Sequence, residues 1–121
     1  LVFDACFLSG LQKISTSLEG VPQQPYRPAI LYNYIQFNDL KPDFVVDISS
    51  FLSQKMEIIK CYSSQFYNPN SNEPETLISQ KSFLDLVVNR SSDLGRFISA
   101  DYAEGFLVHR YIGVNNLFNI I

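Results

Sequence analysis

Apolar residues recur at three- and four-residue steps over the first part of the chain, and this spacing is typical of an amphipathic helix. The members of the stripe are Phe3, Phe7, Leu11, Ile14 and Leu18. They predict a helix from Val2 to about Ser17. The next stretch, GVPQQPYRP, contains three prolines. Because proline fixes φ and lacks an amide donor, this stretch predicts an extended connector that ends near Arg27.

Two short segments have the composition of β-strands. The segment ILYNYIQF, from Ile30 to Phe37, is rich in β-branched and aromatic residues, which are typical of strands. The segment FVVD, from Phe44 to Asp47, is a short apolar run closed by an acid. Such runs are typical of strands buried on both faces of a parallel or mixed sheet, so we expect that setting here.

Two further helices follow the second strand. Ser49 is a suitable N-cap for a helix that runs to about Gln65, since its hydroxyl can accept from the first free amides. A polar loop from Tyr67 to Glu75 comes next. Apolar residues then return at helical spacing from about Thr76 to Ser99, with Gly95 weakening this helix late. The tail predicts an extended hairpin-like or irregular segment followed by one last helical turn.

This order of elements predicts an α/β chain in which short strands alternate with three helices. Two strands are too few for a stable sheet, so we expect the sheet to be completed by residues outside this chain. The sequence begins at Leu1, without a methionine and inside the first predicted helix. We therefore interpret the chain as a single partial domain whose missing part is N-terminal. An open sheet edge near Ile30 would invite association into homo-oligomers or aggregates.

Composition narrows the class of protein. The chain has 121 residues, 46% of them hydrophobic and 17% charged, which is the composition of one globular domain. A net charge of −3 and scattered basic residues argue against nucleic acid as a partner. No apolar run is long enough to span a membrane and no secretory signal is recognisable, so we expect a cytoplasmic protein. Cys6 and Cys61 are far apart and fit two reduced, buried thiols.

Candidate catalytic residues are few and isolated. His109 is the single histidine, and its neighbours form no metal-binding pattern, which favours a surface or hydrogen-bonded role. The acids Glu73, Glu75 and Glu104 are not forced together by their spacing, and capping or exposed roles explain them. Asp47 is the best candidate among the acids, because ligands gather outside the carboxyl ends of strands in open α/β sheets.

Two arginines and the polar loop complete the candidates. Arg27 follows a stiff connector, and its planar guanidinium suits a carboxylate or a developing oxyanion, although composition alone favours a structural ion pair. Arg90 is predicted to form a salt bridge or to cap a group within the fold. The loop from Tyr67 to Glu75 could be a lid, a partner surface or a connector, and the residues alone favour a connector.

A longer pattern is present from Pro42 to Phe106. It contains PDFVVDIS, a helix that ends in YSSQF, the loop NPNSNEPET, an R…G pair and YAEGF, in that order. This pattern resembles the C-terminal half of the LmbE/PIG-L family of zinc-dependent N-deacetylases. It is most similar to the bacillithiol-pathway subgroup, which removes acetate from an N-acetylglucosaminyl malate. The resemblance covers essentially the whole chain, with SGL, YNY and IGV at residues 9–11, 32–34 and 112–114 adding to it.

The resemblance implies a Rossmann-like α/β fold and a zinc ion held by two histidines and one aspartate. The zinc would activate a water that attacks the acetamide carbonyl, with a neighbouring aspartate as general base. In the family these groups belong to an AHPDD-type motif and a later H-x-D-H motif, and neither occurs in this sequence. We therefore expect the zinc ligands in a missing N-terminal half, and we expect this chain to be inactive alone.

The resemblance also assigns roles to four residues of this chain. Arg27 matches an arginine that lines the active site in relatives and would hold the substrate or the anion formed from it. Phe83 matches a position where some relatives carry a tyrosine proposed to stabilise the oxyanion, but a phenyl ring cannot donate a hydrogen bond. Tyr67 or Ser79 could substitute for that tyrosine, or zinc could act without it. The polar loop would then be a flexible wall of a pocket for a small amino-sugar conjugate.

A second interpretation belongs to a different class of protein. The chain could be a non-catalytic interaction or scaffold domain that has the same architecture. Sequence upstream of Leu1 would separate the two, because only the enzyme needs an AHPDD-like motif.

Overall fold

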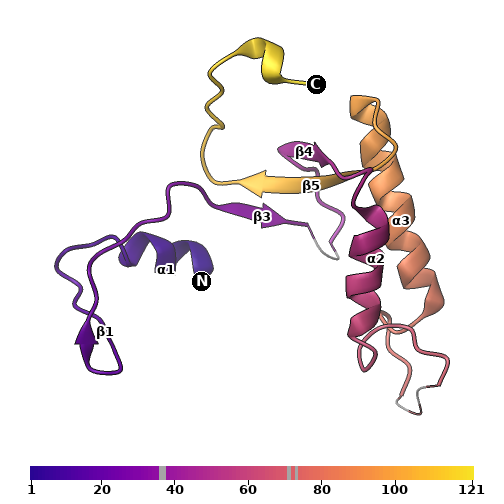
Figure 1. Cartoon of the computed structure of the whole chain (residues 1–121), viewed down its shortest axis with the longest axis horizontal. Coiled ribbons are helices and arrows are strands. Elements are labelled where there is room, and N and C mark those ends of the chain that lie inside the picture. The colour runs from indigo at the N-terminus through magenta and orange to yellow at the C-terminus, as the bar shows by residue number, and fades with distance from the viewer. Residues whose placement is uncertain (36–37, 71, 73) are drawn as a thin grey trace.

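A three-stranded antiparallel sheet joins two arms of the molecule, an N-terminal arm with α1 and β1 and a helical arm with α2 and α3 (Figure 1). The computed structural model describes residues 1–35, 38–70, 72 and 74–121. In chain order the elements are α1 (Val2–Leu8), β1 (Ser17–Leu18), β2 (Val21–Pro22), β3 (Tyr32–Tyr34), β4 (Phe44–Asp47), α2 (Leu52–Cys61), α3 (Lys81–Gly95), the 3₁₀ helix η1 (Arg96–Ile98), β5 (Ala103–Val108) and the 3₁₀ helix η2 (Leu117–Asn119). The predicted α/β class is confirmed in this mixed form.

The first helix is shorter than its apolar stripe predicts. Ser9 ends it, because the Ser9 carbonyl accepts from the Tyr26 amide at 3.0 Å instead of from the next helical turn. The Ser9 hydroxyl also donates to the Tyr26 carbonyl at 2.7 Å. The prediction of helix from Ser9 to Ser17 is therefore wrong. The chain instead leads into the β1–β2 hairpin, whose turn residues Glu19 and Gly20 have φ values of 51° and 81°.

The main sheet has the strand order β3-β5-β4, and both outer strands run antiparallel to β5. The predicted strand Phe44–Asp47 is confirmed with the same bounds as β4. Its predicted setting is wrong, because β4 pairs antiparallel and Val46 and Asp47 are exposed. β3 lies inside the predicted strand Ile30–Phe37, whose last two residues, Gln36 and Phe37, lie outside the described residues.

The strand β5 holds the sheet together, although the sequence suggested only an extended or irregular segment there. It pairs with β3 from Tyr32↔Val108 to Tyr34↔Phe106 and with β4 from Phe44↔Phe106 to Asp47↔Ala103. Three aromatic rings meet across these pairs, since Phe44 stacks on Phe106 at 5.3 Å and contacts Tyr32 edge-on at 5.0 Å. Such cross-strand aromatic pairs stabilise a sheet. The predicted last helical turn is present as η2.

Ser49 does not cap α2 as the sequence suggested, because the N-cap residue is Phe51 and no side chain caps this end. The Ser49 hydroxyl instead donates to Oδ1 of Asp47 at 2.6 Å and accepts from the Tyr102 amide at 3.1 Å. It therefore ties the end of β4 to the residue before β5. The helix itself ends at Cys61, four residues before the predicted Gln65.

The longest helix, α3, begins at Lys81, later than the predicted Thr76. Thr76 and Ser79 bond each other in a local turn, in which the Thr76 amide donates to Ser79 Oγ at 2.7 Å and the Ser79 amide to Thr76 Oγ1 at 3.3 Å. Such side-chain-to-backbone bonds compete with helix formation. At the other end of α3 the chain continues as η1. Ser99 caps the end of η1 and has a left-handed backbone with φ of 58°.

The core of the described residues lies between α3 and β5. Its buried members are Leu84, Ser91, Gly95, Ala103 and Gly105. Both cysteine thiols are free, as predicted, but the expectation that both are buried is wrong, since Cys61 is exposed and Cys6 half-buried. Among the described residues, no helix is at once long enough and apolar enough to cross a membrane.

We predict that Gly95→Ala destabilises the fold. Alanine is normally the better helix former by about 1 kcal/mol, but a Cβ at this position would lie 2.6 Å from the Ala100 carbonyl oxygen. Because that oxygen is backbone and cannot move aside cheaply, we expect a loss of about 1–3 kcal/mol in the free energy of unfolding, measured with urea. Gly113→Ala is the control, since a Cβ there meets nothing within 4 Å. A neutral or stabilising Gly95→Ala would contradict the close packing.

Candidate functional site

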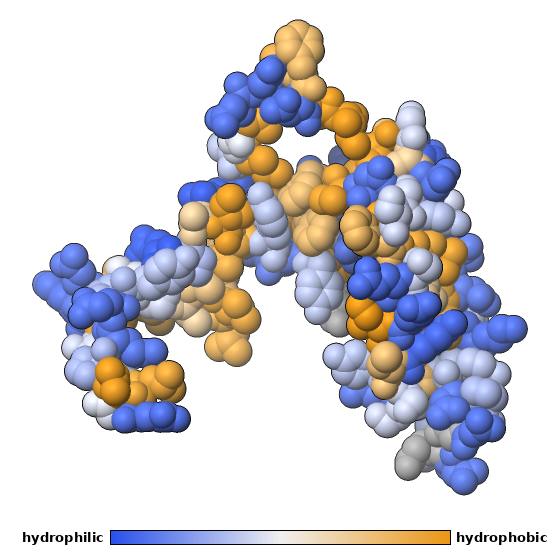
Figure 2. All heavy atoms as spheres, in the orientation of Figure 1, coloured by the Kyte–Doolittle hydropathy of each residue, from blue (hydrophilic) through white to orange (hydrophobic). Residues whose placement is uncertain are grey.

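A cleft with a volume of about 720 Å³ lies between α2, α3 and the beginning of β5. Its walls are mostly apolar and include Phe51, Ile58 and Leu86, whose side chains are large and exposed. In the space-filling view, apolar side chains gather where the sheet meets the two helices, and the outer side of α3 is hydrophilic (Figure 2). The cleft is therefore an apolar surface open to solvent.

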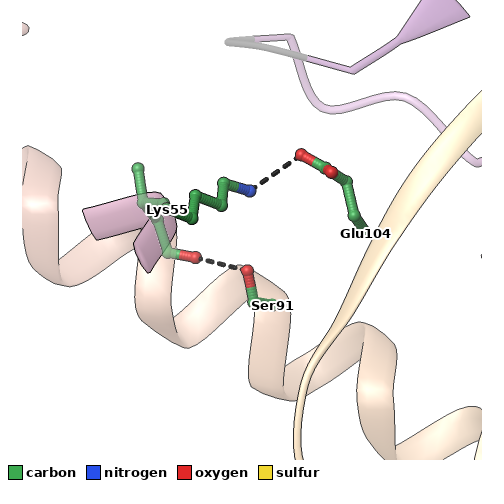
Figure 3. Close-up of polar contacts among 4 residues, drawn as sticks. Lys55, Ser91 and Glu104 are labelled. Carbon is green, nitrogen blue, oxygen red and sulfur yellow. Dashed lines mark hydrogen bonds and ion pairs between the residues drawn. The ribbon is translucent and has the colours of Figure 1, made fainter. Parts of the chain in front are cut away.

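An ion pair crosses the wall of this cleft. Lys55 reaches from α2 toward Glu104 on β5, and Nζ of Lys55 lies 2.8 Å from Oε1 of Glu104 (Figure 3). Both side chains retain 29% of their exposed area. Nearby on α3, the Ser91 hydroxyl donates to the Val87 carbonyl of its own helix at 3.0 Å (Figure 3). Lys55 thus pairs with Glu104, and the Ser91 hydroxyl is bonded within α3.

A second hollow, of about 470 Å³, is enclosed by the loop between α2 and α3. Two predicted site residues, Tyr67 and Ser79, line it, and so does Glu75. The Ser79 hydroxyl is engaged within the loop, where it accepts from the Thr76 amide and donates to the Thr76 carbonyl at 3.1 Å. Glu73, another acid considered from the sequence, lies outside the described residues.

Phe83 packs beside a residue that lines both hollows. Its ring stacks on Phe66 with the centroids 5.8 Å apart. Phe66 lines both the loop hollow and the cleft, whereas Phe83 lines the cleft alone. The structure therefore brings Tyr67, Ser79 and Phe83 to one end of the helical arm.

Arg27, the remaining predicted site residue, lies on the N-terminal arm. Its guanidinium donates to the Phe7 carbonyl at 3.1 Å and lies 4.5 Å from the centroid of the Phe7 ring. Gly10 provides the space for it, because a Cβ there would lie 2.6 Å from Nε of Arg27. Since Phe7 belongs to α1, which is remote from α2 and α3 (Figure 1), the described residues do not bring Arg27 to the other three.

The candidate acids do not form a pair on the sheet. The register places Asp47 opposite Ala103 and Glu104 opposite Val46. Because successive strand residues point to opposite faces, the two carboxylates lie on different faces of the sheet. Asp47 is exposed, and hydrogen bonds from the hydroxyl and the amide of Ser49 lower the pKa of its carboxyl below the ordinary value of 3.8. This carboxylate stays charged at neutral pH.

The two remaining sequence candidates have structural partners. His109 is exposed and hydrogen-bonded, as expected, with Nε2 lying 2.8 Å from Nδ2 of Asn33. Its ring also contacts Phe3 of α1 at 4.2 Å between centroids. Arg90 donates to the Asn38 carbonyl at 2.8 Å, which fits the second of its two predicted roles, a salt bridge or a cap within the fold.

The described residues offer no site for zinc. No three histidine, cysteine, aspartate or glutamate side chains cluster in the part of the chain that the structure describes. A zinc ion would therefore need ligands that these residues do not provide.

Sequence reasoning missed the partner of Glu104. Lys55 precedes it by 49 residues, and neither local spacing nor a motif joins the two. Helical periodicity could have indicated that Lys55 lies one turn from Phe51 and Ile58, on the same side of α2. It could not have shown that β5 lies beside that side.

No known protein-family model matches the chain. Among solved structures, the chain is similar to the conserved protein TT1542 from Thermus thermophilus, with a TM-score of 0.72 and 23% sequence identity. The match covers 94% of this chain and 45% of that protein. This chain therefore spans less than half the length of the Thermus protein. At this level of identity the likeness shows that the two share a fold.

We predict that Ser49 controls the titration of Asp47. Because the folded pKa is lowered, the charged carboxylate contributes stability that is fully present above pH 3.8 and is lost as the pH falls through the lower, folded value. Ser49→Ala should raise the pKa of Asp47 toward 3.8 in a carboxyl NMR titration. Ser82→Ala is the control, because its hydroxyl contacts Gln80 instead. If the pKa of Asp47 is unchanged in Ser49→Ala, the hydrogen bond from the Ser49 hydroxyl is not the cause of the shift.

We also predict a measurable coupling between Lys55 and Glu104. In a double-mutant cycle with Lys55→Met and Glu104→Gln, urea unfolding should give a coupling free energy of about 0.5–1 kcal/mol that falls at high salt. The control cycle uses Asp93→Asn and Arg96→Met, a pair whose side chains are 61% and 64% exposed. Its coupling should be no more than about 0.3 kcal/mol. Equal coupling in the two cycles would show that the cleft does not strengthen its ion pair.

Proposed function

We propose that this chain is the C-terminal portion of a cytoplasmic zinc-dependent N-deacetylase of the LmbE/PIG-L type. Its substrate is a small N-acetylglucosamine conjugate such as N-acetylglucosaminyl malate, the acetamide of which is hydrolysed in bacillithiol biosynthesis. The observation that carries the proposal is the ordered series PDFVVDIS, YSSQF, NPNSNEPET, R…G and YAEGF. The zinc ligands belong to a portion of the protein outside these 121 residues.

One finding is compatible with this division. The chain is α/β, and a protein with the same fold has more than twice the matched length. A zinc-bearing portion would supply the Lewis acid for amide hydrolysis, and this chain would supply residues that bind and orient the substrate.

Arg27 is the residue to which the proposal gives the largest role. Its guanidinium is fixed by the Phe7 carbonyl and the Phe7 ring, and Gly10 leaves it just enough room. A donor held in this way loses little freedom when an anion binds. In the proposed enzyme it holds a carboxylate of the substrate or the oxyanion formed at the acetyl carbon.

In the proposed enzyme the loop hollow binds a part of the substrate other than the part held by Arg27, because the described residues do not bring the two together. Phe83, which lines the adjoining cleft, offers an apolar surface and no donor. The Ser79 hydroxyl is already bonded to Thr76. Tyr67 is therefore the better choice between the two neighbours that could replace an oxyanion-stabilising tyrosine.

The proposal predicts that the complete polypeptide encoded by the gene binds zinc and releases acetate from N-acetylglucosaminyl malate. The 121-residue chain with added zinc should release none. In the complete polypeptide, Arg27→Ala should lower kcat/KM by roughly 100-fold, the scale of one lost oxyanion donor. Gly10→Ala should also lower it, because the added Cβ displaces Arg27.

Arg110→Ala is the matched control for that experiment, since Arg110 likewise donates to a backbone carbonyl, that of Ala29. It should leave kcat/KM within about twofold of the parent, and thermal unfolding should show similar stability for all three variants. Turnover by the isolated chain would refute the division into two portions. A complete polypeptide that neither binds zinc nor releases acetate would instead support a non-catalytic scaffold.

A further inference from the structure

The molecule exposes far more surface than a compact protein of its size. A folded monomer of 13.8 kDa is expected to have an accessible surface of about 6,600 Å², whereas this chain has 10080 Å². The difference, roughly 3,500 Å² on this chain alone, is several times the ~800 Å² that one partner buries in a standard interface. We therefore expect part of this surface to be covered by protein and not by solvent.

The exposed area is rich in large apolar side chains, and the cleft between α2, α3 and β5 collects several of them. Phe51, Ile58 and Leu86 retain 62%, 53% and 51% of their exposed area. They come from the N-cap of α2, from α2 itself and from α3, and they line one concavity of about 720 Å³. Patches of this kind on a soluble protein mark interaction surfaces.

The polar content of the cleft restricts what can cover it. The Lys55–Glu104 pair neutralises itself, and the Ser91 hydroxyl is bonded within α3. An occupant therefore needs no charge opposite this pair, and its own matching face must be apolar to displace water favourably. The other charged side chain that lines the cleft, Arg90, donates to the Asn38 carbonyl.

The fold comparison indicates the source of such a face. The Thermus protein has the fold of this chain over 45% of its length, and the rest of its length consists of further residues of the same polypeptide. We propose that the cleft is the docking surface for the remaining portion of this α/β fold, which presents an apolar face to α2, α3 and β5. The inference rests on the proposed function only in treating the chain as one portion of a larger protein.

The test compares chemical labelling in the complete polypeptide and in the 121-residue chain. In a background with Cys6→Ser and Cys61→Ser, single cysteines are introduced as Ile58→Cys and Leu86→Cys in the cleft. Their matched controls are the exposed neighbours Glu57→Cys and Asp85→Cys, which do not line the cleft. Maleimide labelling rates are measured by mass spectrometry.

In the complete polypeptide, the cleft cysteines should react at least tenfold more slowly than their neighbours, and in the isolated chain all four should react at similar rates. Hydrogen exchange on the unsubstituted proteins provides a second measurement, with α2 and α3 slower in the complete polypeptide. Equal rates at cleft and control positions in the complete polypeptide overturn the inference. Protection in the isolated chain that increases with its concentration also overturns it, since a second copy would then cover the cleft.

This experiment is independent of catalysis. A complete polypeptide that protects the cleft but binds no zinc would refute the proposed function and leave the docking surface in place. A complete polypeptide that releases acetate while its cleft cysteines stay reactive would refute the docking surface and leave the proposed function in place.

Discussion

The close approach of α3 to β5 is the contact on which the rest of the structure depends. Two glycines make it possible, since a Cβ at Gly95 would meet the backbone that leads from Ala100 into β5, and a Cβ at Gly105 would lie 3.3 Å from Cδ1 of Leu94 on α3. Between them, Leu84 and Ala103 form the buried apolar core of the described residues. Because β5 also pairs with both outer strands, loss of this contact would separate the helical arm from the sheet.

The same contact explains how ordinary residues gather into a candidate site. Once β5 lies along α3, Glu104 is presented to Lys55 of α2, although the two are distant in sequence. The loop between α2 and α3 must then fold back at the far end of the helices, which places Tyr67 and Ser79 around one hollow. The site is thus a consequence of helix and strand packing, and only its loop depends on local turn chemistry.

Sequence reasoning succeeded where the signal was local and failed where a distant partner decided the outcome. The strand Phe44–Asp47 and the capping role of Arg90 followed from local composition and position. The early end of α1 did not, because it depends on a bond between Ser9 and Tyr26 across the connector. Ser49 had the chemistry of a helix cap, yet Tyr102, from a remote segment, competed for its hydroxyl. Four of the proposed site residues could be named from the resemblance, but their placement on two arms could not.

That placement constrains the proposed enzyme. Arg27 is fixed on the N-terminal arm by Phe7, and Tyr67, Ser79 and Phe83 lie on the helical arm, so a single substrate cannot contact all four through this chain alone. Either the pocket uses Arg27 with residues of another portion, or the loop acts on a different part of the substrate. In both cases the body that fills the concave side between the arms (Figure 1) would complete the pocket. Under the proposed function, one further portion of the protein would both cover the apolar cleft and supply the metal ligands.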